Sequence, residues 1–269
     1  MSGPPLLACR GVEVRRGERC LLRGLDLEVF AGERWAIVGP NGAGKSSLLL
    51  VLAGARPPQH GRVELGGRAI AQWSVEELAA LRAMVADRWV DPFALGVLEA
   101  VEAARYRLRF GARRAPDARA RAADPAQARQ AVLDCLQSMD CAQLAQRDIR
   151  TLSRGERQRV ALAAAMAQEA ALVLLDEPIS HQDPRHQVHV LQALKERSEC
   201  TFIGALHDIN AAARFATHAL LLPGDGRWQA GRAREVLNCD ALSRLFGTDI
   251  VQVGVGSHRV FVAAGETIA

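Results

Sequence analysis

The sequence lacks the features of a membrane-spanning or secreted chain, and those of a cysteine-based zinc site or redox site. No stretch approaches the roughly 20 apolar residues that cross a bilayer, and residues 1–11 contain no apolar run of signal-peptide length. The six cysteines form no C-x-x-C pair, so neither a zinc site nor a redox motif is indicated. We therefore expect reduced thiols and a chain that stays in the cytoplasm.

An excess of charge of one sign is also missing. The chain has 34 Lys and Arg against 30 Asp and Glu, a net charge of +4, which gives no sign of a nucleic-acid partner. Basic residues concentrate only at 105–121, where seven arginines face a single acid. We interpret this cluster as a solvated surface, with a patch for anionic lipid headgroups as the alternative.

What is present is the composition of an ordinary globular protein. Of the 269 residues, 49% are hydrophobic and 24% charged, and a chain of this length buries roughly 70–75% of the surface of its unfolded state. One large α/β domain with an insertion is the simplest expectation.

A glycine-rich segment follows a short apolar run. Residues 34–38 are typical of a buried strand, and the next eight residues fit the pattern G-x-x-x-x-G-K-[ST] before an apolar helix. The glycines let successive N–H groups point at phosphate oxygens, Lys45 adds a positive charge, and the hydroxyl of Ser46 suits Mg²⁺. The predicted nucleotide-binding residues are Gly39, Pro40, Asn41, Gly42, Ala43, Gly44, Lys45, Ser46 and Ser47.

A second apolar run ends in two acids. Residues 171–175 are typical of a buried parallel strand, and Asp176 and Glu177 stand at its carboxyl end. Downstream of a phosphate-binding loop, this pattern predicts that Asp176 holds Mg²⁺ and that Glu177 polarises the attacking water.

The segment 151–158, T-L-S-R-G-E-R-Q, opens an alanine-rich helix that we expect to run to about Gln168. Ser153 and Glu156 fit a helix capping box, S-x-x-E. Leu-Ser-x-Gly-Glu also resembles the signature motif of ABC ATPases. The two interpretations are compatible, because an open helix N-terminus is itself an anion site. The resemblance implies that Ser153, Gly155 and Glu156 contact ATP bound to a second copy of the chain in a head-to-tail dimer.

The resemblance to ABC ATPases extends from Leu7 to about Val262. Residues 178–183 resemble the D-loop of the family, and His207 stands after a strand expected at 200–204, like the switch histidine that senses the γ-phosphate. The implied catalytic residues are Glu177, His207 and Lys45, and the implied cofactors are ATP and Mg²⁺.

The same resemblance implies an α/β fold. We expect a P-loop NTPase (RecA-like) core with a mainly parallel sheet, an N-terminal antiparallel β subdomain and an inserted α-helical subdomain. The implied single domain, 1–269, has its core at 1–87 and 152–269 and its helical subdomain at 88–151. Periodicity predicts helices at 94–106 and 124–139, with an exposed linker at 111–124 between them.

Two positions depart from the family pattern. Asp87 stands where the family usually carries a glutamine that contacts Mg²⁺ and the attacking water. An aspartate can still ligate Mg²⁺, but it has a shorter reach and adds negative charge, so we expect hydrolysis to be slower or more dependent on the membrane partner. The family's adenine-stacking aromatic residue is also missing near Val14. Arg15 or Arg16 could stack instead, although a surface charge is the favoured interpretation of each.

Finer features resemble the branch of the family that energises uptake of iron–siderophore complexes, haem and cobalamin. They are the segments 92–97 and 207–210 and the tail from residue 235. This kinship implies a peripheral subunit at the cytoplasmic face of the inner membrane. It would bind an integral membrane permease through its helical subdomain and serve a periplasmic binding protein indirectly. Cobalamin or ferric siderophore is favoured over haem as cargo. The alternative function is a non-transport ABC ATPase, such as one that serves iron–sulfur cluster assembly.

Overall fold

The structure is a computed structural model that describes residues 3–87, 94–105, 125–256 and 258–264. The chain divides into two compact units, one formed by Met1–Gln72 with Thr201–Ala269 and the other by Trp73–Cys200. The linker expected at 111–124 and most of the basic cluster at 105–121 lie outside the described residues. No helix in these described ranges is long and apolar enough to cross a lipid bilayer.

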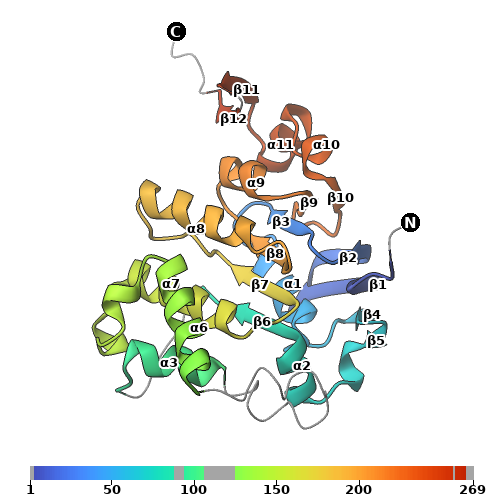
Figure 1. Cartoon of the computed structure of the whole chain (residues 1–269). Helices are drawn as coiled ribbons and strands as arrows, with labels where there is room; N and C mark the ends of the chain where they lie inside the picture. The colour runs from blue at the N-terminus through green and yellow to red at the C-terminus, as the bar shows by residue number, and fades with distance from the viewer. Residues whose placement is uncertain (1–2, 88–93, 106–124, 257, 265–269) are drawn as a thin grey trace. The chain divides into compact units, whose positions relative to one another are not determined.

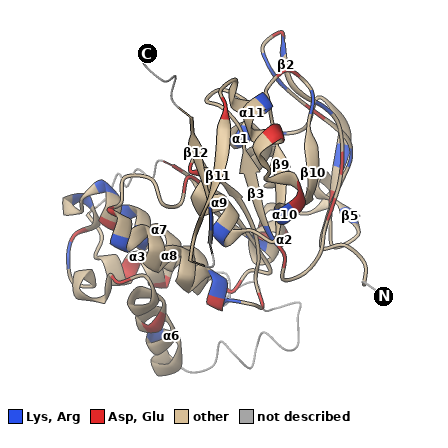
Figure 2. Cartoon of the chain, turned by 90° about the horizontal axis from the view of Figure 1, so that it is seen from above, with Lys and Arg blue, Asp and Glu red and all other residues tan. Residues whose placement is uncertain are grey.

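The first unit begins with an antiparallel sheet, in the strand order β2-β1-β4-β5 (Figure 1). Alternation along β1 buries Val12 and Val14, while charged residues of both signs are interspersed on β1 and β2 (Figure 2). One cross-strand ion pair joins Arg10 to Glu28 at 2.6 Å. The strands are β1 (Leu7–Arg16), β2 (Arg19–Val29), β4 (His60–Leu65) and β5 (Arg68–Ala69), and the short 3₁₀ helix η1 (Ile70–Gln72) follows them.

The same unit contains parallel strands. β3 lies between β9 and β8 and runs parallel to both, and β10 pairs antiparallel with β9. α9 packs against β3 and α1 against β8. This cover explains the continuous apolar sequence of β3, as expected for a parallel strand. The elements are β3 (Arg34–Val38), β8 (Thr201–Ala205), β9 (His218–Leu221), β10 (Gln229–Arg232), α1 (Lys45–Leu52) and α9 (Ile209–Phe215).

The tail of the first unit ends in an antiparallel hairpin that is tied to α9. Asn210 donates from Nδ2 to the carbonyl oxygen of Phe261 at 3.0 Å, and its Oδ1 accepts from the Phe261 backbone N–H at 2.7 Å. Asn210 therefore fixes β12 to α9 as a bidentate backbone mimic. The elements of the tail are α10 (Ala233–Val236), α11 (Cys239–Phe246), β11 (Ile250–Val255) and β12 (His258–Ala263).

The second unit combines two parallel strands with helices. β6 pairs with β7, α7 packs against β6, and α3, α6 and α7 pack on one another (Figure 1). Its elements are α2 (Val75–Leu81), β6 (Arg82–Val85), α3 (Val97–Ala104), α6 (Pro125–Ser138), η3 (Ala142–Leu144), η4 (Ile149–Thr151), α7 (Arg154–Ala167), β7 (Leu172–Asp176) and α8 (Pro184–Glu196). The α/β class with a mainly parallel sheet, an antiparallel β subdomain and a helical region is confirmed.

The helix expected at 94–106 is shorter than predicted. α3 begins at Val97 because Gly96 is its N-cap, and the backbone N–H of Gly96 donates to Glu99 at 3.0 Å. The helix expected at 124–139 is confirmed to within a residue at each end as α6.

Three of the six cysteines are buried. All six are free thiols, and burial raises the pKa of Cys9 and of Cys141 to about 12. A thiol with such a pKa stays protonated at neutral pH and is a poor nucleophile.

Candidate functional site

The glycine-rich loop occupies the turn between β3 and α1 in the first unit. β3 ends at Val38 and α1 begins at Lys45, so the motif lies at a strand-to-helix junction. Gly42 and Gly44 have φ angles of +77° and +100°, a region that glycine adopts readily and other residues rarely. As the N-cap of α1, Gly44 has no side chain to accept the first N–H groups of the helix. An anion can take that role.

Lys45 is held inside the loop. Its side chain is only 6% exposed, and Nζ donates to the carbonyl oxygens of Gly39 at 2.7 Å and Pro40 at 3.0 Å. Two backbone acceptors from the loop itself therefore fix the ammonium group where a phosphate would receive its charge.

A second segment supports the loop, and sequence reasoning missed it. A Cβ at Gly39 would lie 2.1 Å from the carbonyl oxygen of Leu222, and a Cβ at Gly224 would lie 2.7 Å from the Cα of Ala43. Arg19 donates to the carbonyl oxygen of Gly224 at 3.1 Å. The available signal was the turn-forming sequence Pro-Gly-Asp-Gly that begins after Leu222.

His207 leaves the sheet at the same edge as the loop. β3 and β8 are parallel neighbours, with Ile37 opposite Ala205, and the carboxyl ends of parallel strands lie at one edge. His207 follows β8 and is exposed. Asp208 caps α9 by accepting hydrogen bonds from the first turn of the helix at 2.7 and 3.2 Å. The first unit thus brings the loop and His207 to one edge.

Three acidic residues stand at or just beyond the carboxyl ends of two neighbouring parallel strands in the second unit. β6 and β7 run parallel, with Val85 opposite Leu175. Asp176 ends β7 and is 7% exposed, Glu177 follows it, and Asp87 lies two residues beyond β6. Glu177 has φ +51°, a left-handed conformation that costs roughly 1–2 kcal/mol in a residue other than glycine.

A tight turn after Glu177 holds that conformation. The backbone N–H and the hydroxyl of Ser180 both donate to the carbonyl oxygen of Glu177, at 3.2 and 2.9 Å. The buried Gln182 donates to the carbonyl oxygen of Pro178 at 3.1 Å. The segment predicted as the D-loop, 178–183, is therefore a compact turn built on the residue predicted to be the base.

The start of α7 has the geometry of a capping box, as the S-x-x-E pattern predicted. Ser153 Oγ accepts from the Glu156 backbone N–H at 3.3 Å, and Glu156 Oε2 accepts from the Ser153 N–H at 2.8 Å. Hydrogen bonds to the Glu156 carboxylate, first from the backbone N–H of Ser153 and then from its side chain, lower the pKa of Glu156. A Cβ at Gly155 would lie 3.0 Å from the carbonyl oxygen of His181, so this glycine permits close approach of the turn at 178–183.

The oxygen ligands present suit Mg²⁺ bound together with a nucleotide. Within the residues that the structure describes, no group of three or more His, Cys, Asp or Glu is arranged to hold a metal ion. Mg²⁺ is usually held by one or two carboxylates and substrate phosphates rather than by a cage of protein ligands. The hydroxyl of Ser46 in the first unit and the carboxylates of Asp176 and Asp87 in the second are donors of this kind.

The two arginines near the expected adenine position differ in exposure. Arg15 is half-buried, with Nε 3.1 Å from a carboxylate oxygen of Glu13, whereas Arg16 is exposed at the end of β1. The interpretation of both residues as surface charges, and the alternative that one of them stacks on adenine, stay predictions.

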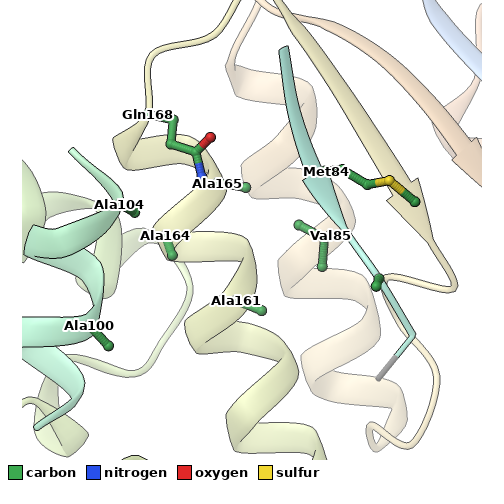
Figure 3. Close-up of a pocket in the computed structure, with 9 residues that line it drawn as sticks. Met84, Val85, Ala100, Ala104, Ala161, Ala164, Ala165 and Gln168 are labelled. Atoms are coloured by element: carbon green, nitrogen blue, oxygen red, sulfur yellow. The ribbon is translucent and has the colours of Figure 1, made fainter. Parts of the chain in front are cut away.

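A cavity of about 360 Å³ opens in the second unit among β6, α3 and α7 (Figure 3). Its lining is mostly alanine from the two helices, with Met84 and Val85 from the strand and Gln168 as a polar residue. It reaches Ala86, the residue before Asp87. A cavity with small apolar walls can accept an apolar side chain or helix edge.

Known proteins are similar to this chain in sequence and in fold. The chain is 40% identical over 246 residues to the hemin import ATP-binding protein HmuV of Streptomyces coelicolor. The alignment covers 91% of this chain and 84% of that protein. A metal-chelate type ABC transporter solved in an inward-facing conformation matches with a TM-score of 0.79 at 25% identity, over 98% of this chain and 100% of that one. A dimeric ATP-binding cassette bound to ADP and Pi matches with a TM-score of 0.69 at 25% identity, over 85% and 99% of the two chains.

The family model described as ABC transporter matches residues 22–180. That range begins within β2 and includes the glycine-rich loop, the capped start of α7 and the acidic end of β7. Because the model covers more than half of the residues and the relative aligns along nearly the whole chain, the chain belongs to the ABC transporter family.

Proposed function

We propose that this chain is the ATP-binding and ATP-hydrolysing subunit that energises a haem importer. The observation that carries the proposal is the 40% identity to a hemin import ATP-binding protein over 91% of the chain. ATP hydrolysis has separate support from the two sheet edges. The edge in the first unit carries the glycine-rich loop and Lys45, and the edge in the second unit carries acidic residues. The relative is named for import, so a non-transport ATPase is not retained as the alternative.

The first unit supplies the groups that grip the nucleotide. The loop Gly39–Ser47 binds the β- and γ-phosphates at the N-terminus of α1 through its backbone N–H groups, of which Pro40 has none, and Lys45 neutralises part of their charge. His207, at the same edge, contacts the γ-phosphate. Ser46 ligates Mg²⁺, which when bound neutralises the phosphate oxygens.

The second unit supplies the groups that activate water. Glu177 accepts a proton from the attacking water as its oxygen bonds to the γ-phosphorus and the bond to the β-phosphate oxygen breaks. Asp176 and Asp87 provide carboxylates for Mg²⁺. Ser153, Gly155 and Glu156 act at the start of α7 on ATP held by a second copy of the chain.

Haem replaces cobalamin and ferric siderophore as the favoured cargo. The sequence-based prediction favours the latter two, but the features behind it resemble the whole branch and do not separate its members, so they carry no weight against haem. The name of the relative supports haem, and the likeness to a metal-chelate type transporter supports the same cargo class.

The partners follow from the proposed role. Two copies pair around ATP at the cytoplasmic face of the inner membrane, and an integral membrane permease binds the second unit. The apolar cavity beside Ala86 supports this site, because a partner seated there would lie one residue from Asp87. A periplasmic haem-binding protein acts through the permease.

Reconstitution tests the proposal. The chain is placed in liposomes with the haem permease that copurifies with it, and ATP hydrolysis and haem uptake are measured with haem-, cobalamin- or ferric-siderophore-loaded binding protein. We expect haem alone to be accumulated, and a Lys45→Ala chain to give neither hydrolysis nor uptake. Accumulation of cobalamin or siderophore in place of haem would refute the cargo, and uptake by the Lys45→Ala chain would refute the ATPase role.

A further inference from the structure

Asp87 has a cationic partner within its own unit. Arg154, the first residue of α7, donates from Nη2 to Asp87 Oδ1 at 3.2 Å. The two residues are 67 positions apart in the sequence, and their side chains are 52% and 32% exposed. The pair therefore joins the segment after β6 to the start of the helix that carries the signature motif.

The neighbouring arginines form a different kind of contact. Arg150 binds Asp148, two residues away, at 2.7 Å, and Arg147 lies 3.9 Å from Glu156. Both of those pairs stabilise the start of α7 itself. The Arg154–Asp87 pair joins residues that are far apart in the sequence, so it connects α7 to a residue outside the helix.

The charge on Asp87 gives the contact its strength. A hydrogen bond between two ionised groups is roughly twice as strong as one between neutral groups. A glutamine at this position would offer a neutral carbonyl and no charge to balance. The ion pair is thus a property of the aspartate that distinguishes this chain from the family pattern.

We propose that Arg154 is a positioning residue for Asp87. The Asp87 carboxylate exchanges between this guanidinium and the Mg²⁺ of bound ATP. The inference rests on the proposed function, which gives Asp87 a role at Mg²⁺. A carboxylate that balances a guanidinium attracts a second cation less, and the guanidinium itself repels Mg²⁺. The short aspartate side chain cannot reach far, whereas Arg154 can swing away on its longer stem.

The exchange connects two parts of the ATPase cycle. While Asp87 holds Arg154, the guanidinium lies against the segment after β6. With Asp87 at the metal, Arg154 would be released beside Ser153 and Gly155, the residues proposed to face the ATP of the second copy. The pair would thereby connect the Mg²⁺ site of a subunit to the signature segment of that same subunit.

The Mg²⁺ dependence of nucleotide binding tests the inference. A fluorescent ATP analogue is titrated into the full chain at increasing MgCl₂, with Glu177→Gln in every variant to suppress hydrolysis. We expect Arg154→Ala to lower the half-saturating Mg²⁺ concentration about two- to five-fold, the range for an exposed ion pair. Binding in EDTA should be unchanged. Arg150→Ala is the matched control, because it removes an equally exposed arginine whose partner lies outside the site.

A double-mutant cycle assigns the effect to Asp87. In an Asp87→Asn background, Arg154→Ala should leave the half-saturating Mg²⁺ concentration unchanged. An equal shift in that background, no shift in the wild-type background, or a rise would overturn the inference; a rise would show that Arg154 directs Asp87 toward the metal. Unchanged melting temperatures exclude misfolding. A parent chain that binds no nucleotide would refute the proposed function itself, whereas normal binding with no Arg154 effect refutes the exchange alone.

Discussion

Ser153 has one structural role and one proposed role, and a pair of matched substitutions can separate them. Its hydroxyl caps α7, with Oγ 3.3 Å from the Glu156 N–H, and the proposed function also directs it at ATP on a second copy. Ser74 caps α2 in the same unit through the same box, with Oγ 3.2 Å from the Glu77 N–H, and has no proposed nucleotide contact. Ser153→Ala and Ser74→Ala therefore remove the same structural contact at two places.

The two substitutions should cost the same stability. Loss of a capping serine costs typically about 1 kcal/mol, which shifts the melting temperature of a chain of this size by about 2–4 °C. The Glu156 and Glu77 carboxylates keep their bonds from the cap backbone N–H, at 2.8 and 2.9 Å, so each helix loses one bond and not the whole box.

Only Ser153→Ala should weaken ATP-driven pairing. A hydrogen bond to a charged group contributes roughly 1.5–3 kcal/mol, and the symmetric dimer would lose one such bond at each of its two ATP sites, so the dimer affinity should fall by about 150-fold or more. Sedimentation velocity with ATP, in a Glu177→Gln background, measures that affinity for both variants. Equal dimer affinities alongside equal losses of melting temperature would refute the nucleotide role and leave Ser153 as a helix cap alone.

Three further predictions concern the loop, the base and the cap. Gly39→Ala should lower the free energy of unfolding by about 1–3 kcal/mol and weaken nucleotide binding, because its Cβ would meet the Leu222 carbonyl oxygen at 2.1 Å. Gly42→Ala is the control in the same melting and binding assays, because Gly42 has φ +77° but open space around its Cβ position, so this variant shows the effect of backbone strain alone. Glu177→Gln should keep ATP binding and lose roughly 10²–10⁴ in hydrolysis rate, measured as released phosphate, and equal turnover would exclude Glu177 as the base. Because the pKa of Glu156 is lowered in the folded chain, its stabilisation is present at neutral pH and is lost as the pH falls below 4.5 through the lowered value; the stability gap between wild type and Glu156→Gln should shrink over that range in chemical denaturation, and a constant gap would contradict it.

Features encoded by neighbouring residues could be predicted from the sequence. The strand at 34–38 has the predicted bounds, because a short apolar run and the glycine motif that ends it are both local signals. The capping box of Ser153 was predictable for the same reason. The predicted start of α3 was wrong, although the sequence carries a local signal there. That signal is Gly96 followed three residues later by Glu99, whose side chain accepts a hydrogen bond from the backbone N–H of the cap residue.

Contacts between distant segments could not be predicted from the sequence. Nothing near Gly39 indicates that Leu222 lies against it, since that approach depends on the pairing of β3 with β9. The position of Asp87 could be predicted by family resemblance, but its pairing with Arg154 depends on how α7 packs against β6. One sequence alone gives no signal for such a pair, because Asp87 and Arg154 each have the pattern of an ordinary surface charge.

Asp87 and Arg154 are best understood as one feature of the acidic edge of the second unit. β7 ends in Asp176, Glu177 follows it, and Asp87 follows the parallel strand β6. Under the proposed function this edge meets a triphosphate, and carboxylates repel a triphosphate unless a cation balances them. In the proposed exchange, Arg154 supplies that charge until Mg²⁺ is bound. A glutamine at position 87 would create no such need.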